Sequence, residues 1–172
     1  MNQLEVFFDY ACPFCLEGHQ NLIRLLPDFP GVEIIWRPCE AHPRPERYGT
    51  HSDLCIQGMF FAEDAGIDLW AYHEWAYSLI LKRRLDVEKI DTLAECFFDL
   101  SGADDLRAAL VSGRYLRKQL AANDYAYEES DVWVVPAYRM NGKRLDSVEN
   151  VGVSIARLRA FLQEASHAQG DL

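Results

Sequence analysis

The chain of 172 residues is long enough for one domain with a buried core, and its formal net charge of −10 excludes a general basic surface for nucleic acid or anionic lipid. Hydrophobic residues make up 49% and charged residues 26%, which is typical of a globular protein in water. No apolar run approaches the roughly 20 residues that cross a bilayer, so we expect no membrane association. The N-terminus carries no basic stretch followed by an apolar one, and we therefore expect a cytoplasmic protein.

The first 36 residues have a β-α-β pattern. Residues 4–8 are an apolar run typical of a strand, and residues 13–26 carry apolar side chains at helical spacing up to Pro27, which cannot continue a helix. Residues 32–36 are predicted to form a second strand. A right-handed crossover would make these two strands parallel neighbours.

A helical pattern then covers residues 52–127. Apolar residues recur there at spacings of three and four, and Ser101 with Asp104 resembles a capping box. The β pattern returns over residues 132–140 and continues through Asn141-Gly142, a strong hairpin signal, into residues 143–147. We predict a last helix over residues 150–165.

Taken together, the pattern is an α/β unit, β-α-β…β-β-α, with an all-helical insertion between its second and third strands. Pro136 lies inside the predicted third strand, where it removes a ladder hydrogen bond. The residues alone favour an edge position there with an ordinary trans peptide bond.

Cys12 and Cys15 form a C-x-x-C pair at the start of the first predicted helix. Unpaired backbone N–H groups and the positive end of the helix dipole favour a thiolate at Cys12, and the thiolate is the species that attacks disulfides. A second thiol three positions on can then close the ring and release the product. Pro13 suits the first helical turn, which needs no N–H there. The pattern thus favours Cys12 as nucleophile and Cys15 as resolving thiol.

A metal site is the main alternative for this pair. Zinc would need two more cysteine or histidine ligands. The suitable spacing falls in a separate run, Cys39, His42, His51 and Cys55, which would make a site without the C-x-x-C. Intervening prolines and the apolar helix face around Cys55 argue against it. A static disulfide framework is disfavoured because a reducing compartment is expected and the five cysteines are odd in number.

Five other side chains are assigned by their context. His19 is predicted to be a solvated helix residue, Cys39 a half-buried bystander and Cys96 a core residue. Trp70 and Trp75 belong to an aromatic-rich helical segment that mostly predicts core packing. Either tryptophan could also line a hydrophobic cleft facing Cys12.

The strand, the C-P-x-C at a helix start and the Val-Pro before an Asn-Gly hairpin resemble the thioredoxin superfamily. The helical insertion narrows the resemblance to the DsbA-like branch, including cytoplasmic FrnE-type proteins. FFDYACPFC, WRPCEAHPRP, DTLAECFFDLSGADDLRAALVSGRY and DVWVVPAYRMNGK are similar to stretches of that branch, and the match covers nearly the whole chain. The resemblance implies a thioredoxin-like fold, with residues 1–172 as a single domain and residues 52–127 as its insertion.

The resemblance also implies a function and a site. The function is that of a thiol–disulfide oxidoreductase or isomerase acting on protein or small-thiol disulfides, with glutathione as a further partner and no cofactor or metal. The implied site comprises the nucleophile Cys12, the resolving Cys15, the motif residues Pro13 and Phe14, and a substrate-contacting Val135 with Pro136 in cis. This assignment replaces the trans prediction for Pro136.

Two departures from the branch concern redox behaviour. Phe14 replaces the histidine inside the motif of the best-studied DsbA, which implies a less oxidising pair. Val6 stands where several relatives have a buried carboxylate, and Asp9 is the nearest carboxylate that remains. The alternatives are a glutathione-dependent transferase or isomerase of the kappa-like branch, whose members generally have serine at the first motif position, and a Cys/His metal-binding or thiol-sensing module.

Overall fold

The computed structural model describes residues 1–100 and 105–168, so the predicted capping box at Ser101 and Asp104 lies outside the described residues. The strands are β1 (Asn2–Phe8), β2 (Val32–Pro38), β3 (Ala137–Met140) and β4 (Lys143–Asp146). The helices are α1 (Pro13–Leu25), α2 (Asp53–Asp64), α3 (Leu69–Tyr77), α4 (Ile90–Cys96), α5 (Asp105–Val111), α6 (Leu116–Asp124) and α7 (Ile155–His167). In this part of the chain, no helix is long and apolar enough to cross a membrane.

The four strands form one mixed sheet in the order β2-β1-β3-β4. β1 and β2 are parallel, as the β-α-β pattern predicts, with Val6 opposite Trp36. β3 runs antiparallel to both β1 and β4. The hairpin between β3 and β4 turns at Asn141 and Gly142, whose φ angles of 51° and 75° match the left-handed turn that this dipeptide favours. The thioredoxin-like β-α-β…β-β-α order is therefore confirmed.

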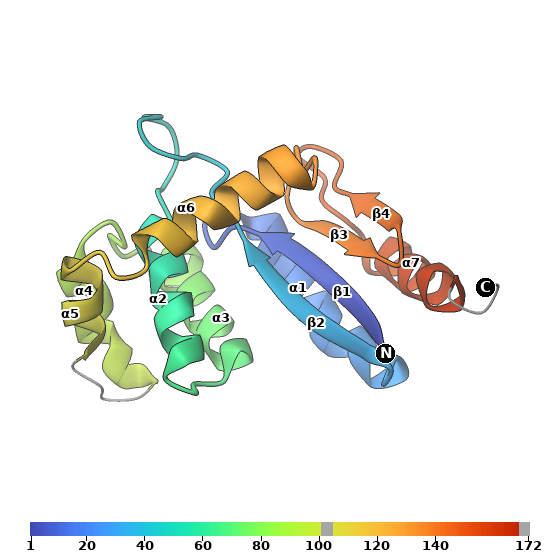
Figure 1. Ribbon diagram of the computed structural model, residues 1–172, viewed down its shortest axis with the longest axis horizontal. Helices are drawn as coiled ribbons and strands as arrows, with labels where there is room; N and C mark the ends of the chain where they lie inside the picture. The colour runs from blue at the N-terminus through green and yellow to red at the C-terminus, as the bar shows by residue number, and fades with distance from the viewer. Residues whose placement is uncertain (101–104, 169–172) are drawn as a thin grey trace.

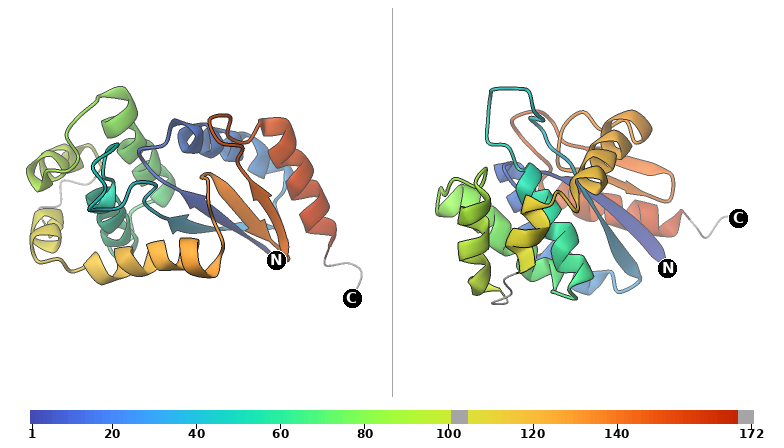
Figure 2. Two further views of the ribbon diagram at one scale, coloured as in Figure 1. Left: turned by 90° about the horizontal axis from the view of Figure 1, so that it is seen from above. Right: turned by 60° about the vertical axis from the view of Figure 1, so that its left-hand side comes forward.

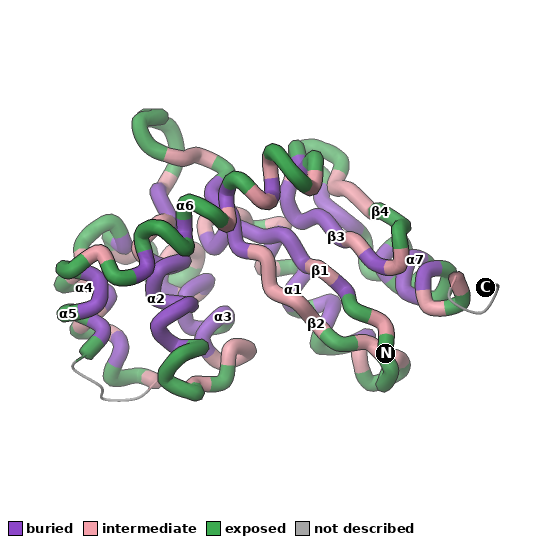
Figure 3. Tube along the Cα trace, viewed as in Figure 1, coloured by how far each residue is buried: buried purple, intermediate pink, exposed green. Residues whose placement is uncertain are grey.

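The sheet is the middle layer of the α/β unit. Helices α1 and α7 cover one face of it, whereas α6 crosses the other face (Figures 1 and 2). Helices α2 to α5 stand beside the sheet, near the end of β2, and the helical run between β2 and β3 extends from Asp53 to Glu129. This arrangement is the predicted helical insertion. The buried residues lie along β1 and β3 and on the inner sides of α2 and α3 (Figure 3).

The apolar run of β1 packs on both faces of the sheet, which is why it shows no polar alternation at its end. Phe8 packs edge-on against Trp36 and His73, at ring-centroid distances of 5.8 and 5.0 Å. Phe7, on the opposite face, stacks on Tyr125 at 6.0 Å. β1 thus joins the sheet to the helical segment on both sides and ends directly at the C-x-x-C loop.

Two predicted element bounds are wrong near the C-terminus. The strand predicted over 132–140 begins only at Ala137, because the preceding residues form a loop that ends at Pro136. The helix predicted over 150–165 begins at Ile155, since Asn150 and Gly152 have φ angles of 59° and 78°, which a right-handed helix excludes. Ser154 caps this helix by accepting a hydrogen bond from the Arg157 N–H. Both loops approach Cys12.

Candidate active site

Cys12 lies at the N-cap of α1, and Pro13 occupies the first helical position. The Cys12 backbone is extended, with φ −96° and ψ 116°, and the Cys12 N–H donates to the Asp9 carbonyl at 3.1 Å. The Cys12 Sγ lies 3.7 Å from the carbonyl oxygen of Val135, which belongs to the loop before β3. Two segments 123 positions apart in sequence therefore meet at this sulfur.

Cys15 sits one turn into α1, and the two cysteines approach to 3.3 Å as free thiols. The hydrogen bond from the Cys15 thiol, helped by the backbone N–H groups of Cys15 and Phe14, lowers the pKa of Cys12 despite its partial burial. Complete burial raises the pKa of Cys15 well above that of an ordinary thiol. The pair is therefore asymmetric, with an accessible thiol that ionises easily and a buried thiol that keeps its proton.

Removing the Cys15 thiol should raise the pKa of Cys12, because it removes the largest contribution that lowers it. We expect the iodoacetamide reaction of Cys12 in a Cys15→Ala variant to reach half its maximal rate at a higher pH than in the parent protein. The measurement is best made in a Cys96→Ser background, since Cys96 is half-exposed. Cys55→Ala, which removes a fully buried thiol elsewhere, is the control. An unchanged midpoint in Cys15→Ala would contradict this assignment.

Asp9 is a buried carboxylate between the C-x-x-C loop and the loop after β2. It accepts hydrogen bonds from the N–H groups of Ala11 at 2.9 Å and Ala41 at 2.7 Å, and burial raises its pKa. Its own N–H faces the Cys15 Sγ at 3.5 Å. Val6, at the position where several relatives have a carboxylate, is a buried apolar residue. In β1 and the loop after it, Asp9 is therefore the carboxylate residue that lies against the cysteine pair.

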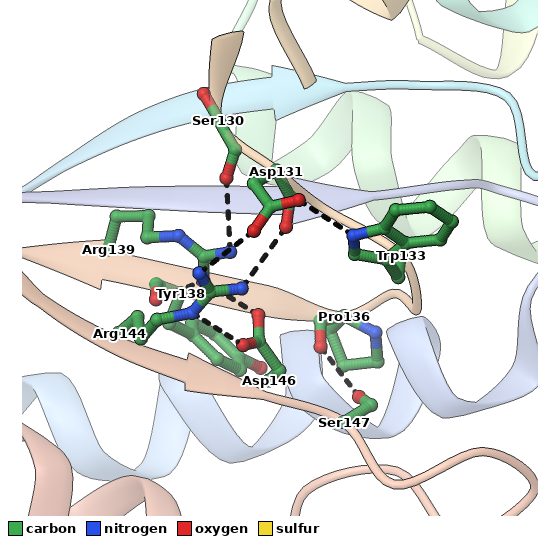
Figure 4. Close-up of polar contacts among 9 residues, drawn as sticks. All are labelled: Ser130, Asp131, Trp133, Pro136, Tyr138, Arg139, Arg144, Asp146 and Ser147. Carbon is green, nitrogen blue, oxygen red and sulfur yellow. Dashed lines mark hydrogen bonds and ion pairs between the residues drawn. The ribbon is translucent and has the colours of Figure 1, made fainter. Parts of the chain in front are cut away.

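The loop before β3 carries Val135 and Pro136, and the peptide bond between them is cis. The Ser147 hydroxyl donates to the Pro136 carbonyl at 2.6 Å and fixes this loop to the segment after β4. Further upstream, Arg144 of β4 donates to the Asp131 carbonyl at 3.1 Å and pairs with the Asp131 carboxylate at 3.3 Å (Figure 4). Both ends of the loop are therefore held by β4 and the residue that follows it.

Gly18 of α1 lies against this loop, and a Cβ on it would be 3.4 Å from the Pro136 Cγ. A Cβ on Gly18 would lie 2.6 Å from the Tyr138 hydroxyl, which is closer than a side-chain contact allows. Tyr138 is fully buried, so its ring cannot move aside into solvent. Its hydroxyl has no hydrogen-bond partner among the described residues. The glycine thus lets α1 approach the loop that contains Pro136.

Gly18→Ala should therefore destabilise the fold, although alanine is the better helix former by about 1 kcal/mol. Overpacking of this kind costs about 1–3 kcal/mol. In a Tyr138→Phe background, where the hydroxyl is absent, we expect the same substitution to be neutral or stabilising. Urea unfolding of the four proteins measures the difference, and Gly31→Ala, where a Cβ would meet nothing within 4 Å, is the control. An equal cost of Gly18→Ala in both backgrounds would rule out the hydroxyl contact.

A groove of about 650 Å³ opens beside Cys12. Its lining is drawn from the C-x-x-C loop, the loop after β2, and the loops flanking the hairpin: Asp9, Ala11, Cys12, Pro13, Phe14, Ala41, His42, Tyr127, Trp133, Val134, Val135, Glu149 and Asn150. Trp70 and Trp75 do not line it, so the alternative that either faces a cleft at Cys12 is wrong, whereas the packing that the aromatic pattern mainly predicts is observed. Trp75 is buried and donates to the Cys96 carbonyl at 3.2 Å, while Trp70 packs on Trp36 and His19. The tryptophan at the groove is Trp133.

The predicted metal run is not gathered into a site. Across residues 1–100 and 105–168, no group of three or more His, Cys, Asp or Glu side chains is placed to hold a metal ion. Cys39 and Cys55 are fully buried, which raises the pKa of each thiol. His51 instead interacts through Nδ1 with the His42 carbonyl at 2.9 Å. Cys39 is therefore core rather than half-buried, and Cys96 is half-exposed rather than core.

Two polar side chains are buried that the sequence did not predict to be buried. His19 is buried rather than solvated, because Trp70 and Tyr77 of the helical segment cover it at ring-centroid distances of 5.2 and 5.7 Å. Glu40, which the sequence did not single out, is buried where Gln119 and Asn123 of α6 donate to its carboxylate at 2.6 and 2.8 Å. Its position right after Cys39, at the end of a strand, was the available signal.

A thioredoxin-like sheet, an asymmetric thiol pair at the start of α1 and a Val-Pro loop against the first sulfur define the class of DsbA-type thiol–disulfide oxidoreductase folds. Residues 3–163 match the model of the DSBA-like thioredoxin domain family, and the chain belongs to that family.

The chain is also similar to individual proteins in fold or in sequence. The chain is similar to a probable DsbA oxidoreductase from Streptomyces coelicolor, with a TM-score of 0.79, 17% identity, and coverage of 100% of this chain and 92% of the other. It is also similar to Chlamydia trachomatis DsbA, with a TM-score of 0.69, 14% identity, and coverage of 98% and 88%. By sequence, it is 24% identical to the uncharacterized Bacillus subtilis protein YwbO, over 78% of this chain and 84% of that protein. Sequence identities this low to solved structures show the shared fold and do not indicate which substrate this chain uses.

Proposed function

We propose that this protein exchanges disulfides with thiol or disulfide substrates through Cys12 as nucleophile and Cys15 as resolving thiol. The observation that carries the proposal is the asymmetric pair: two free thiols at 3.3 Å, with the pKa of Cys12 lowered and that of Cys15 raised. Such a pair attacks through one sulfur and keeps the other protonated until it is needed. Membership of the DSBA-like family supports this reaction class.

The exchange balances without a cofactor. The Cys12 thiolate attacks one sulfur of a substrate disulfide, so that a mixed disulfide forms and the other substrate sulfur leaves as a thiolate, which takes up a proton. Cys15 then loses its proton and attacks the Cys12 sulfur, which frees the second substrate thiol and leaves a Cys12–Cys15 disulfide. Two electrons pass from the pair to the substrate, and the reverse sequence oxidises a dithiol substrate.

The surroundings of the pair suit these steps. Pro13 and Phe14 keep the Cys12 sulfur at the open end of α1, beside the groove. The Val135 carbonyl, 3.7 Å from that sulfur, and the adjoining Pro136 offer backbone next to the position where a substrate sulfur would bind. Asp9, whose N–H faces the Cys15 sulfur, is a buried carboxylate residue beside the thiol that loses its proton in the second step. The cytoplasmic location stays a prediction.

A glutathione redox titration tests the proposal. The protein is equilibrated at a series of ratios of reduced to oxidised glutathione, quenched with acid, and alkylated, and the alkylated residues are identified by mass spectrometry. We expect Cys12 and Cys15 to change together in one two-electron transition, while fully buried Cys39 and Cys55 stay reduced. Independent transitions of the two cysteines, or none at any ratio, would refute the redox pair.

A further inference from the structure

Trp133 is the most exposed aromatic side chain of the described residues, at 84% against 79% for Tyr48 and 63% for Phe98. It lines the groove beside Cys12 and lies two residues before Val135, whose carbonyl faces the Cys12 sulfur. Single exposed aromatic side chains are common on protein surfaces, but Trp133 differs from Tyr48 and Phe98 because it lines the groove that contains Cys12. Its open ring is therefore placed where a substrate bound at Cys12 would contact it.

The ring is also fixed in place. Its indole N–H donates to the Asp131 carboxylate at 2.7 Å, and Arg144 pairs with the same carboxylate at 3.3 Å (Figure 4). Asp131 has a φ of 51°, so the backbone turns sharply just before the tryptophan. Arg144 is held in turn by Asp146 at 2.8 Å. The indole N–H of Trp133 is thus held by Asp131, and Asp131 is held by Arg144. A side chain that is already fixed in this way loses little conformational entropy when a ligand covers it.

The charge around the groove has one sign. Its lining contains neither lysine nor arginine. Of its two carboxylates, Asp9 is buried and has a raised pKa, so the exposed negative charge comes from Glu149, which forms no ion pair within the described part of the chain. His42, the histidine of the lining, interacts through Nδ1 with the Glu46 carboxylate at 3.1 Å. The chain as a whole carries a net charge of −10. The groove therefore attracts cations and repels carboxylates.

We propose that Trp133 is the docking residue for an extended polypeptide substrate and that its open face takes a lysine or arginine side chain next to the substrate cysteine. A cation over an indole ring is attracted by the ring quadrupole, and Glu149 in the same groove adds the opposite charge. Glutathione, with two carboxylates, finds no cationic side chain in this lining. The inference rests on the proposed disulfide exchange and names its substrate class.

The test compares three oxidised probes in single-turnover reactions with the reduced protein. Two are peptides with an internal disulfide and identical sequence except for arginine or glutamate beside one cysteine, and the third is oxidised glutathione. We expect the wild-type protein to reduce the arginine peptide roughly three- to tenfold faster than the glutamate peptide. Oxidised glutathione should react more slowly than the arginine peptide.

The decisive quantity is the ratio of the two peptide rates in three groove variants and one control variant. Trp133→Ala should lower the ratio to the smaller preference that Glu149 alone provides, and Trp133→Phe should retain more of it because a phenyl ring still attracts a cation. Glu149→Gln should lower the ratio. Phe98→Ala removes an exposed aromatic that does not line the groove, and it should leave the ratio at the wild-type value.

The outcomes separate the two proposals. Exchange with all probes and a peptide ratio that Trp133→Ala does not change would overturn the docking inference and leave the redox pair standing. A wild-type ratio of one, or a faster reaction with oxidised glutathione than with the arginine peptide, would do the same. Absence of exchange with every probe would overturn both.

Discussion

Replacement of Cys12 with serine is expected to reduce disulfide exchange by roughly 10³-fold or more, to the rate of the buffer thiols. A serine hydroxyl in the same N-cap position stays protonated at neutral pH, so the species that attacks the disulfide is absent. Cys15→Ser should behave differently. Cys12 can still attack, but the mixed disulfide cannot be resolved within the protein, and it should accumulate.

Both variants can be measured with one assay. Reduction of a peptide disulfide gives the exchange rate, and mass spectrometry of the acid-quenched protein detects the adduct. Cys96→Ser is the matched control because it removes the other half-exposed cysteine, on α4, and it should leave rate and adduct unchanged. Full activity in Cys12→Ser, or an adduct on another cysteine in Cys15→Ser, would show that the exchange does not run through this pair.

The C-x-x-C site could be predicted from sequence because its determinants are local. A strand end, a proline at the first helical position and a cysteine three residues later fix the place of Cys12 at the N-cap through the geometry of one helical turn. The Asn-Gly hairpin is local in the same sense. The parallel pairing of β1 and β2 follows from a general rule of handedness, which needs no side-chain detail.

The groove around the pair could not be predicted, because it depends on contacts between distant segments. Trp133 resembles one more apolar residue of a strand until Asp131, Arg144 and Pro136 show that its segment is a loop. His19 looks like an exposed helix residue until α3 is placed against α1. In both cases the local pattern was compatible with two environments, and only the tertiary arrangement chooses between them.

His19→Phe is expected to make the protein less sensitive to acid. Both ring nitrogens of His19 lie buried without a hydrogen-bond partner among the described residues, and burial lowers the pKa of this histidine from 6.5 to about 4. Between those values the unfolded chain binds a proton at His19 that the folded chain does not bind. Stability therefore falls as the pH falls from 6.5 toward 4, by up to about 3 kcal/mol from this group.

Phenylalanine has a similar shape and no proton to bind, so the variant should lose this contribution. We expect its advantage over the parent in urea unfolding to be about 2 kcal/mol larger near pH 5 than at a pH above 7, where the histidine is neutral in both states. His73 contributes its own acid sensitivity to both proteins, since its pKa is also lowered by burial, and the comparison cancels it to first order. His42→Gln, at a half-exposed side chain, is the matched control for the loss of a histidine from the chain. If His19→Phe shows the same pH dependence as the parent, then the aromatic residues around His19 do not keep it neutral, and α3 does not pack against α1 as described.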